Sequence, residues 1–256
     1  MRDSHVEAVY FTVSSGEEIS YKNPEPLSFQ NHLGEFCLRD GLLKVVPTEH
    51  FSSGVEASQA IDGFLRAWEI ESDLKCNLCT IRFTYSHADM IDRDPPPLGE
   101  SQVIHAVGIC SGIAIGDSFQ VHVVLGRYPE PPERFSATEY AQHAYRRWLR
   151  YRNGQEPLQS MAYFIITLME RIAGSRAKAC ELFKVDMVVR NKMGDLCSER
   201  GSALTARKAQ SAGFDDLSPI EQDWLERAVR HLILRLGEQA SGQAFDQITM
   251  ENVERL

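Results

Sequence analysis

Long hydrophobic runs are missing from this chain of 256 residues. Its most apolar stretch, residues 161–169, is far shorter than the roughly 18 residues that a transmembrane helix needs. The sequence therefore predicts no membrane span. The opening stretch, MRDSHVEAVYFTV, also lacks a basic region followed by a continuous apolar run, so no signal peptide is visible. A cytoplasmic location is the resulting expectation.

An excess of positive charge is missing as well. The chain has 27 Lys/Arg against 36 Asp/Glu, which gives a net charge of −9. This balance argues against a protein that coats nucleic acid or anionic membranes non-specifically. Residues 1–135 hold 10 Lys/Arg and 20 Asp/Glu, whereas residues 136–256 hold 17 and 16. The asymmetry predicts a boundary near residue 135.

The chain lacks a disulfide framework. Its six cysteines are scattered, and a chain of this size does not need disulfides for stability, so reduced thiols are expected. Cys76 and Cys79 have the spacing of a metal knuckle or a redox pair. A structural zinc would need a second ligand pair, and a redox pair belongs at a helix N-terminus. Because this pair is predicted to enter a strand, two ordinary thiols are the simpler interpretation.

Familiar catalytic motifs are also absent. The chain has no Gly-rich phosphate loop, no G-x-S-x-G, no H-E-x-x-H and no G-x-G-x-x-G. A site built from residues far apart in the sequence is still compatible with these absences, because catalytic groups meet in space. No cofactor and no metal site are predicted.

The signals that are present in the first 134 residues are mostly those of strands. β-Branched and aromatic residues or alternating apolar residues predict strands over residues 6–13, 36–39, 42–46, 78–85, 103–109 and 119–125. Asp40 and Gly41 connect two of these strands and predict a hairpin, because both central positions of such a turn take positive φ.

One helix is predicted among these strands. Ser53 and Glu56 have the spacing of a capping box. The apolar stripe that follows includes Trp68 and ends near Glu71, so this helix is expected to pack across one face of the sheet.

The second part of the chain has only helical signals. Helices are predicted over residues 137–152, 156–174, 175–183, 187–196, 202–210 and 219–236. The strongest signal is Ser218-Pro219-Ile220-Glu221, which combines a capping box with Pro at the first helical position. Residues 156–174 are apolar on nearly every face, which predicts a buried helix at the centre of a three-helix core.

One candidate site follows the strand predicted over residues 78–85. There the chain gathers one imidazole, three carboxylates and one guanidinium: His87, Asp89, Asp92, Asp94 and Arg93. Loops often carry sites, and these groups suit a divalent cation. The alternative is that they cap a turn before the prolines at 95–97, because the spacing lacks the Gly and the closing Glu of an EF-hand. His105 and His122 could likewise face one another across two strands, or be isolated histidines.

A second candidate is basic. Arg146, Arg147 and Arg150 lie in the last turns of the helix predicted over residues 137–152. Such a cluster can hold phosphate groups. The alternative is pairing with carboxylates within the chain, since a helix C-terminus also favours cations.

A third candidate lies on the last strong helix. An all-helical region that carries Arg227 and His231 is faintly similar to HEPN ribonuclease domains, in which four to six residues separate an Arg from the His that follows it. Here three residues separate the two, and Ala228 occupies the position where Asn or Asp usually follows the Arg. The resemblance covers one helix, so no catalytic role is carried over from it.

Together these observations predict an α+β fold. An antiparallel, β-rich region with one packed helix, residues 1–134, precedes an all-helical region, residues 135–256. The two regions are either separate domains or parts of one continuous domain. The expected function is that of a non-catalytic interaction or sensing module that binds a protein or a small ligand. The alternative is a hydrolase or nuclease, HEPN-like or metal-dependent, that acts on a phosphate-containing substrate.

Overall fold

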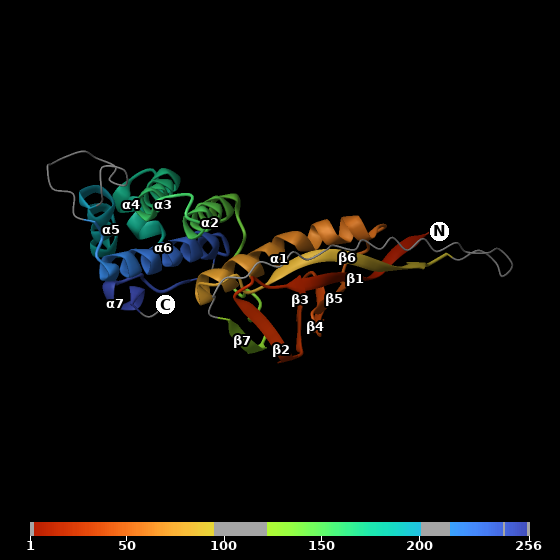
Figure 1. Cartoon of the computed structure of the whole chain (residues 1–256). Coiled ribbons are helices and arrows are strands. Elements are labelled where there is room, and N and C mark those ends of the chain that lie inside the picture. Colours follow the sequence, from red (N-terminus) through yellow and green to blue (C-terminus); the bar gives the residue numbers. More distant parts are fainter. Residues whose placement is uncertain (1–2, 95–121, 201–215, 243, 255–256) are drawn as a thin grey trace. The chain divides into compact units, whose positions relative to one another are not determined.

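The computed structural model describes residues 3–94, 122–200, 216–242 and 244–254. It has the α+β fold predicted from the sequence, with a β-rich first part and a helical second part (Figure 1). The chain divides into two compact units, Met1–Pro131 and Pro132–Leu256. The boundary near residue 135 that the charge asymmetry indicates stays a prediction. Within the described ranges, no helix is long and apolar enough to cross a membrane.

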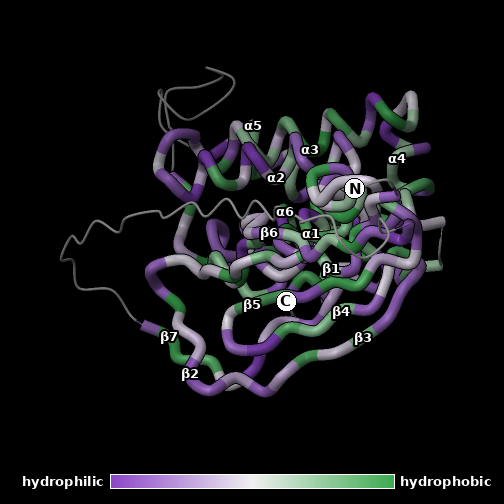
Figure 2. The backbone as a smooth tube through the Cα atoms, turned by 90° about the vertical axis from the view of Figure 1, so that its right-hand side faces the viewer, coloured by the Kyte–Doolittle hydropathy of each residue, from purple (hydrophilic) through white to green (hydrophobic). Residues whose placement is uncertain are grey.

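The first unit is built on an antiparallel five-stranded sheet. Its strand order is β3-β4-β5-β1-β6, and the strands lie side by side in Figure 2. The bounds are β1 Ser4–Ser14, β3 Leu27–Asn31, β4 Gly34–Arg39, β5 Leu42–Pro47 and β6 Arg82–Asp92. Asp40 and Gly41, with φ of 50° and 74°, form the predicted hairpin turn between β4 and β5. A separate parallel pair joins β2 (Ile19–Glu25) to β7 (Val123–Arg127).

Helix α1 (Gly54–Cys76) packs on one face of this sheet (Figure 1). The Ser53 side chain accepts a hydrogen bond from the Glu56 backbone N–H, as predicted, whereas the Glu56 carboxylate bonds to Ser52. The core between helix and sheet includes Phe11, Phe36, Leu43, Ile61 and Trp68. Burial of such side chains contributes roughly 1.5–3 kcal/mol each, which makes this layer the main stabilising feature of the unit.

Residues along the strands alternate between this core and solvent. In β4, Phe36 and Leu38 are buried while Glu35 and Cys37 are exposed. The same alternation runs along β5. An antiparallel sheet that is covered on one side only has this pattern. One face of the sheet is therefore exposed to solvent.

Two predicted boundaries in this unit are wrong. Helix α1 continues past Glu71 to Cys76, and the following strand begins at Arg82 rather than residue 78. The reason is the buried Asp73, whose carboxylate accepts hydrogen bonds from the Thr80 backbone N–H (2.9 Å) and from the Arg82 guanidinium (2.5 Å). These polar bonds fix the last turns of α1 to the start of β6.

Two further strand predictions concern residues 103–109 and 119–125. The first range lies outside the described residues. Of the second, the described part contributes to β7, which begins at Val123.

The second unit is helical, as predicted. Its helices are α2 (Glu139–Arg152), α3 (Leu158–Ala173), α4 (Arg176–Leu182), α5 (Met187–Glu199), α6 (Pro219–Ala240) and the single turn α7 (Met250–Val253). The helix predicted over residues 202–210 lies outside the described residues.

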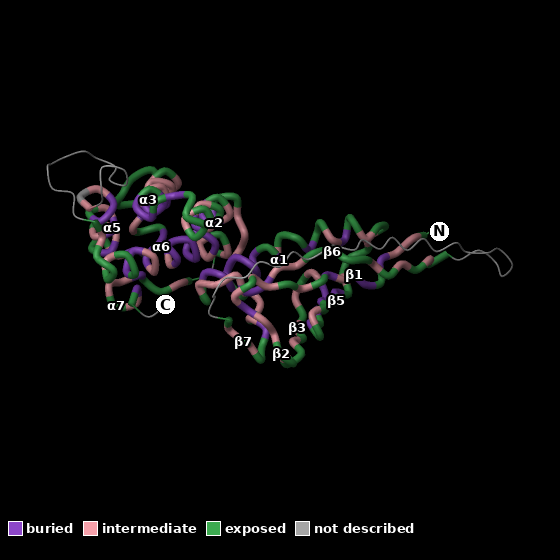
Figure 3. The backbone as a smooth tube through the Cα atoms, in the orientation of Figure 1, coloured by how far each residue is buried: buried purple, intermediate pink, exposed green. Residues whose placement is uncertain are grey.

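Helix α3 is the centre of this unit, because it packs against α2, α4, α5 and α6. Ile165 is fully buried there. The prediction that this helix is buried on nearly every face was wrong, however, because Tyr163, Phe164 and Leu168 are only half-buried. Figure 3 shows the burial along the chain.

Helix α6 begins with the predicted capping box between Ser218 and Glu221. The prediction that it ends at residue 236 was wrong, since it continues to Ala240. Gly237 is instead a packing position, because a Cβ there would lie 2.2 Å from the Phe135 ring. The apolar side chains of α6 are buried from Trp224 onward, while Ile220 is 81% exposed.

Candidate functional site

The solvent face of the five-stranded sheet brings together residues from four strands. Cys37 lies opposite Lys44, Lys44 opposite Tyr10, and Tyr10 opposite His87. Directly opposed residues of an antiparallel sheet project on the same side. These four residues form one row across β4, β5, β1 and β6, which we call the open-face row. Cys37, Lys44 and His87 are exposed, and Tyr10 is half-buried.

Tyr10 is the fixed member of the open-face row. Its ring stacks on the His87 imidazole, with centroids 4.4 Å apart and planes within 7°. Its hydroxyl donates a hydrogen bond of 2.8 Å to Asp89 Oδ2. Lys44 Nζ lies 5.9 Å from the centre of the Tyr10 ring, within cation–π range. The Tyr10 ring is thus held by a stack and a hydrogen bond.

The electrostatics of Tyr10 make it a hydrogen-bond donor rather than a nucleophile. The hydrogen bond to the Asp89 carboxylate, together with some burial, raises the pKa of the Tyr10 phenol above its ordinary value. The phenol therefore keeps its proton at neutral pH, and Asp89 Oδ2 is occupied. Two exposed apolar side chains on β5, Leu42 and Val46, project on the same side and flank Lys44.

The loop predicted over residues 87–94 is mostly strand, which corrects that part of the sequence analysis. Its residues up to Asp92 belong to β6. The polar composition arises because one side of β6 faces solvent. An extra residue, Ser86, sits between the pairs Tyr10–His87 and Phe11–Tyr85 and forms a bulge.

The predicted cluster is divided into two groups. His87 and Asp89 lie around Tyr10, as described above. Asp92 Oδ1 accepts hydrogen bonds from the backbone N–H groups of Asp3 and Asp94. Arg93 donates through Nη2 to His5 Nε2 at 2.8 Å. The candidates His87, Asp89, Asp92 and Arg93 therefore do not share one site.

No group of three or more His, Cys, Asp or Glu side chains is placed to hold a metal ion within the described ranges. His105 lies outside these ranges. His122 precedes β7 rather than lying in a strand, and its Nε2 is 2.8 Å from Ser20 Oγ.

Cys76 and Cys79 flank the C-terminus of α1, not the start of a strand. Asn77, in the left-handed conformation, ends the helix between them. Burial raises the pKa of the Cys79 thiol. This is the opposite of the environment at a helix N-terminus, where a redox thiolate is stabilised.

The arginines of α2 are not a free cluster. Arg147 donates to both carboxylate oxygens of the buried Glu156, at 3.1 Å from Nε, and its guanidinium lies 4.2 Å from the Phe164 ring centre. Arg146 and Arg150 are exposed. Arg147 therefore stabilises the packing of this unit, and two exposed arginines remain as phosphate candidates.

Arg227 and His231 are one turn apart on α6 but have separate partners. Arg227 is paired with Asp223. His231 Nε2 donates to the Asn252 backbone carbonyl at 3.1 Å. Burial lowers the pKa of His231 to about 4, so its imidazole is neutral at pH 7. Arg227 is therefore paired within α6, whereas His231 connects α6 to α7.

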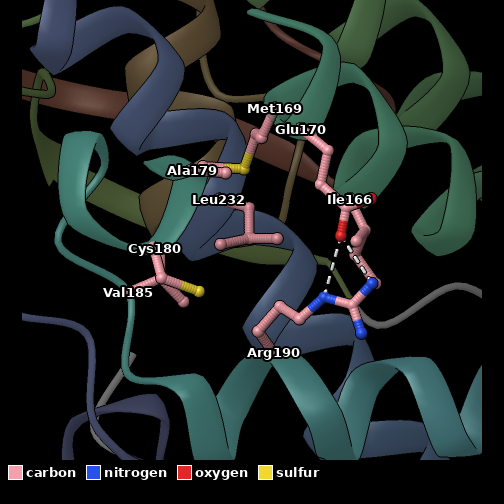
Figure 4. Close-up of a pocket in the computed structure, with 8 residues that line it drawn as sticks. All are labelled: Ile166, Met169, Glu170, Ala179, Cys180, Val185, Arg190 and Leu232. Atoms are coloured by element: carbon pink, nitrogen blue, oxygen red, sulfur yellow. Dashed lines mark hydrogen bonds and ion pairs between the residues drawn. The ribbon is translucent and has the colours of Figure 1, made fainter. Parts of the chain in front are cut away.

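A small hollow with a cavity volume of about 20 Å³ lies among α3, α4, α5 and α6 (Figure 4). Its polar groups, Glu170 and Arg190, are bonded to each other at 2.5 and 3.0 Å. Burial raises the pKa of the Cys180 thiol at its wall. The hollow is far smaller than a ligand pocket of roughly 300–1,000 Å³, and its two charged residues are paired with each other.

The sequence analysis missed Cys37, Lys44 and Tyr10. Each lies in a predicted strand, so its residue type was explained by the strand. Only the register of four strands makes them neighbours, and the Ser86 bulge fixes His87 opposite Tyr10. Cys37 and Lys44 occupy exposed positions of the predicted hairpin, and this exposure is the signal that could have marked them as site residues.

No protein-family model matches the chain, and neither a curated protein nor a solved structure is similar to it.

Proposed function

We propose that this protein is a non-catalytic interaction module, and that its partner is a protein that docks on the open-face row. The observation that carries the proposal is the Tyr10 side chain, which is stacked on His87 and bonded to Asp89 while it faces solvent. A tyrosine that is already held in one conformation loses little entropy on binding, and aromatic residues are frequent anchors of protein interfaces.

The surroundings of Tyr10 support a protein partner. Leu42 and Val46, each 37% exposed, supply apolar area beside the cation of Lys44. Apolar side chains next to a few polar groups are the composition of a typical interface centre. The row is spread over an exposed sheet surface, where a reacting group would not be sheltered from water. The hydrolase or nuclease alternative stays a prediction.

Variants of the full-length chain test the proposal. Immobilised wild-type protein and a Tyr10→Ala/Lys44→Glu double variant are exposed to the same cell extract, and a protein retained only by the wild type is purified. Calorimetric titration should then show at least about tenfold weaker binding to Tyr10→Ala, which corresponds to about 1.4 kcal/mol.

Gln59→Lys is the matched control, because Gln59 is exposed on α1, which covers the other side of the sheet. It should leave the affinity unchanged. A purified partner that binds Tyr10→Ala and wild type equally well would refute the docking surface, provided that the variant's circular dichroism shows it to be folded.

A further inference from the structure

A chain of hydrogen bonds at one end of the sheet joins three segments that are far apart in the sequence. His5 belongs to β1, His50 lies between β5 and α1, and Arg93 follows β6. Arg93 Nη2 is 2.8 Å from His5 Nε2, and His5 Nδ1 is 2.8 Å from His50 Nδ1. The imidazole planes are within 4° of each other.

The Arg93 guanidinium determines which imidazole nitrogens in this series of hydrogen bonds carry a proton. A guanidinium can only donate, so His5 Nε2 must be unprotonated and accept from Arg93. A neutral His5 then carries its proton on Nδ1 and donates it to His50. His50 Nδ1 must accept, and its own proton is on Nε2. The two bonds exist together only when both imidazoles are neutral.

We propose that His5, His50 and Arg93 form an acid-sensitive clasp, which is closed at neutral pH and is opened by protonation of either imidazole. A proton on His5 Nε2 would face the Arg93 donor, and a proton on His50 Nδ1 would face the His5 donor. Each change replaces a hydrogen bond by two opposed N–H groups, and protonation of His5 also places its cation against the Arg93 guanidinium.

The charges around His5 are mixed. Desolvation, Arg93 and His50 lower the pKa of His5, while Asp3 and Glu7 on its own side of the sheet raise it. The net direction is downward from the ordinary value of about 6.5. His5 is therefore neutral at pH 7. Its contribution to folding is fully present above its ordinary pKa of about 6.5 and is lost as the pH falls through the lowered pKa of the folded protein.

Backbone hydrogen bonds report whether the clasp is closed. The Val6 N–H donates to the Phe51 carbonyl at 3.0 Å, and the Arg93 N–H donates to the Asp3 carbonyl at 2.9 Å. Both bonds join the segments that the clasp holds together. Opening of the clasp should therefore expose these two amides to exchange with solvent.

Hydrogen exchange of the full-length protein at pH 7.5 and 5.5, corrected for the intrinsic pH dependence of exchange, tests this. We expect protection of the Val6 and Arg93 amides to fall at least tenfold at pH 5.5 in the wild type. In His50→Ala protection should already be reduced at pH 7.5 and should fall less at pH 5.5 than it does in the wild type, because only the His5–Arg93 bond remains. His32→Ala, which alters an exposed histidine between β3 and β4, should behave as the wild type does.

The ring resonances of the histidines give a second readout. His5 should titrate below its ordinary range, and Arg93→Leu should move this titration to higher pH. Equal protection of the two amides at both pH values in the wild type, or a His5 titration that is unaffected by Arg93→Leu, would overturn the clasp.

Discussion

In Met1–Pro131 a sheet packs one face under α1 and leaves the other in solvent, whereas in Pro132–Leu256 the helices surround a shared core. The two arrangements treat polar side chains differently. Lys44 and His87 of the sheet are exposed. Arg147 and Arg235 of the helices are bonded to carboxylates and carbonyls of their own unit. Arg147 and Arg235 therefore stabilise the helical unit, whereas the exposed Lys44 and His87 are accessible to a partner.

The largest effect is expected where the helical core is most enclosed. Ile165→Asp would bury a carboxylate at a fully buried position of α3. An unpaired buried charge costs more than about 4 kcal/mol, so soluble expression should be abolished. Arg146→Ala, an exposed change in α2, should express normally. Soluble, folded Ile165→Asp protein would contradict the central role of α3.

A smaller effect should come from Arg235, which is buried on α6. Its guanidinium donates to the carbonyls of Phe183 and Asp246, each at 2.7 Å, and to Glu238 at 2.9 Å. Arg235→Met would leave these carbonyls without their donor, and a loss of about 3 kcal/mol in the free energy of unfolding is expected. Urea denaturation measures it.

Arg227→Met on the same helix is the control, because Arg227 pairs with the exposed Asp223. Exposed ion pairs contribute about 0–1 kcal/mol. If Arg235→Met and Arg227→Met were equally stable, the buried Arg235 would not stabilise the helical unit more than Arg227 does, and this part of the comparison would be wrong.

The smallest effect concerns pH. The pKa of His231 is lowered to about 4 in the folded protein, so folding favours the neutral imidazole. This stabilisation is complete above about pH 6.5 and is lost as the pH falls toward 4, by about 2 kcal/mol once partial exposure is taken into account. His231→Gln should show a correspondingly shallower pH dependence in urea denaturation.

His143→Gln, at an exposed position of α2, should retain the wild-type pH dependence. An identical pH profile for His231→Gln and wild type would mean that His231 is not protected from protonation by the fold.

The sequence predicted the features that depend on local chemistry. Asp40–Gly41 marked the hairpin because few residues accept positive φ at two successive positions. Ser218 and Glu221 marked the start of α6 because they satisfy each other's backbone donors. The class of the fold followed from such signals.

Features that depend on distant residues could not be predicted. Helix α1 extends beyond Glu71 because Asp73 finds partners in Thr80 and Arg82. The His87 region is a strand because β1 pairs with it, and no local pattern contains that pairing. Only part of the candidate site could therefore be predicted from the sequence. His87 and Asp89 were predicted as site residues, whereas Tyr10 is recognised only from the strand register.

The most direct test of the open-face row is the maleimide labelling rate of Cys37, which is exposed within it. Cys76, exposed at the end of α1, is the internal reference. With the purified partner at saturation, labelling of Cys37 should slow at least about tenfold while that of Cys76 is unchanged, because a docked protein excludes the reagent from the row. Unchanged labelling of Cys37 in the saturated complex would contradict the account.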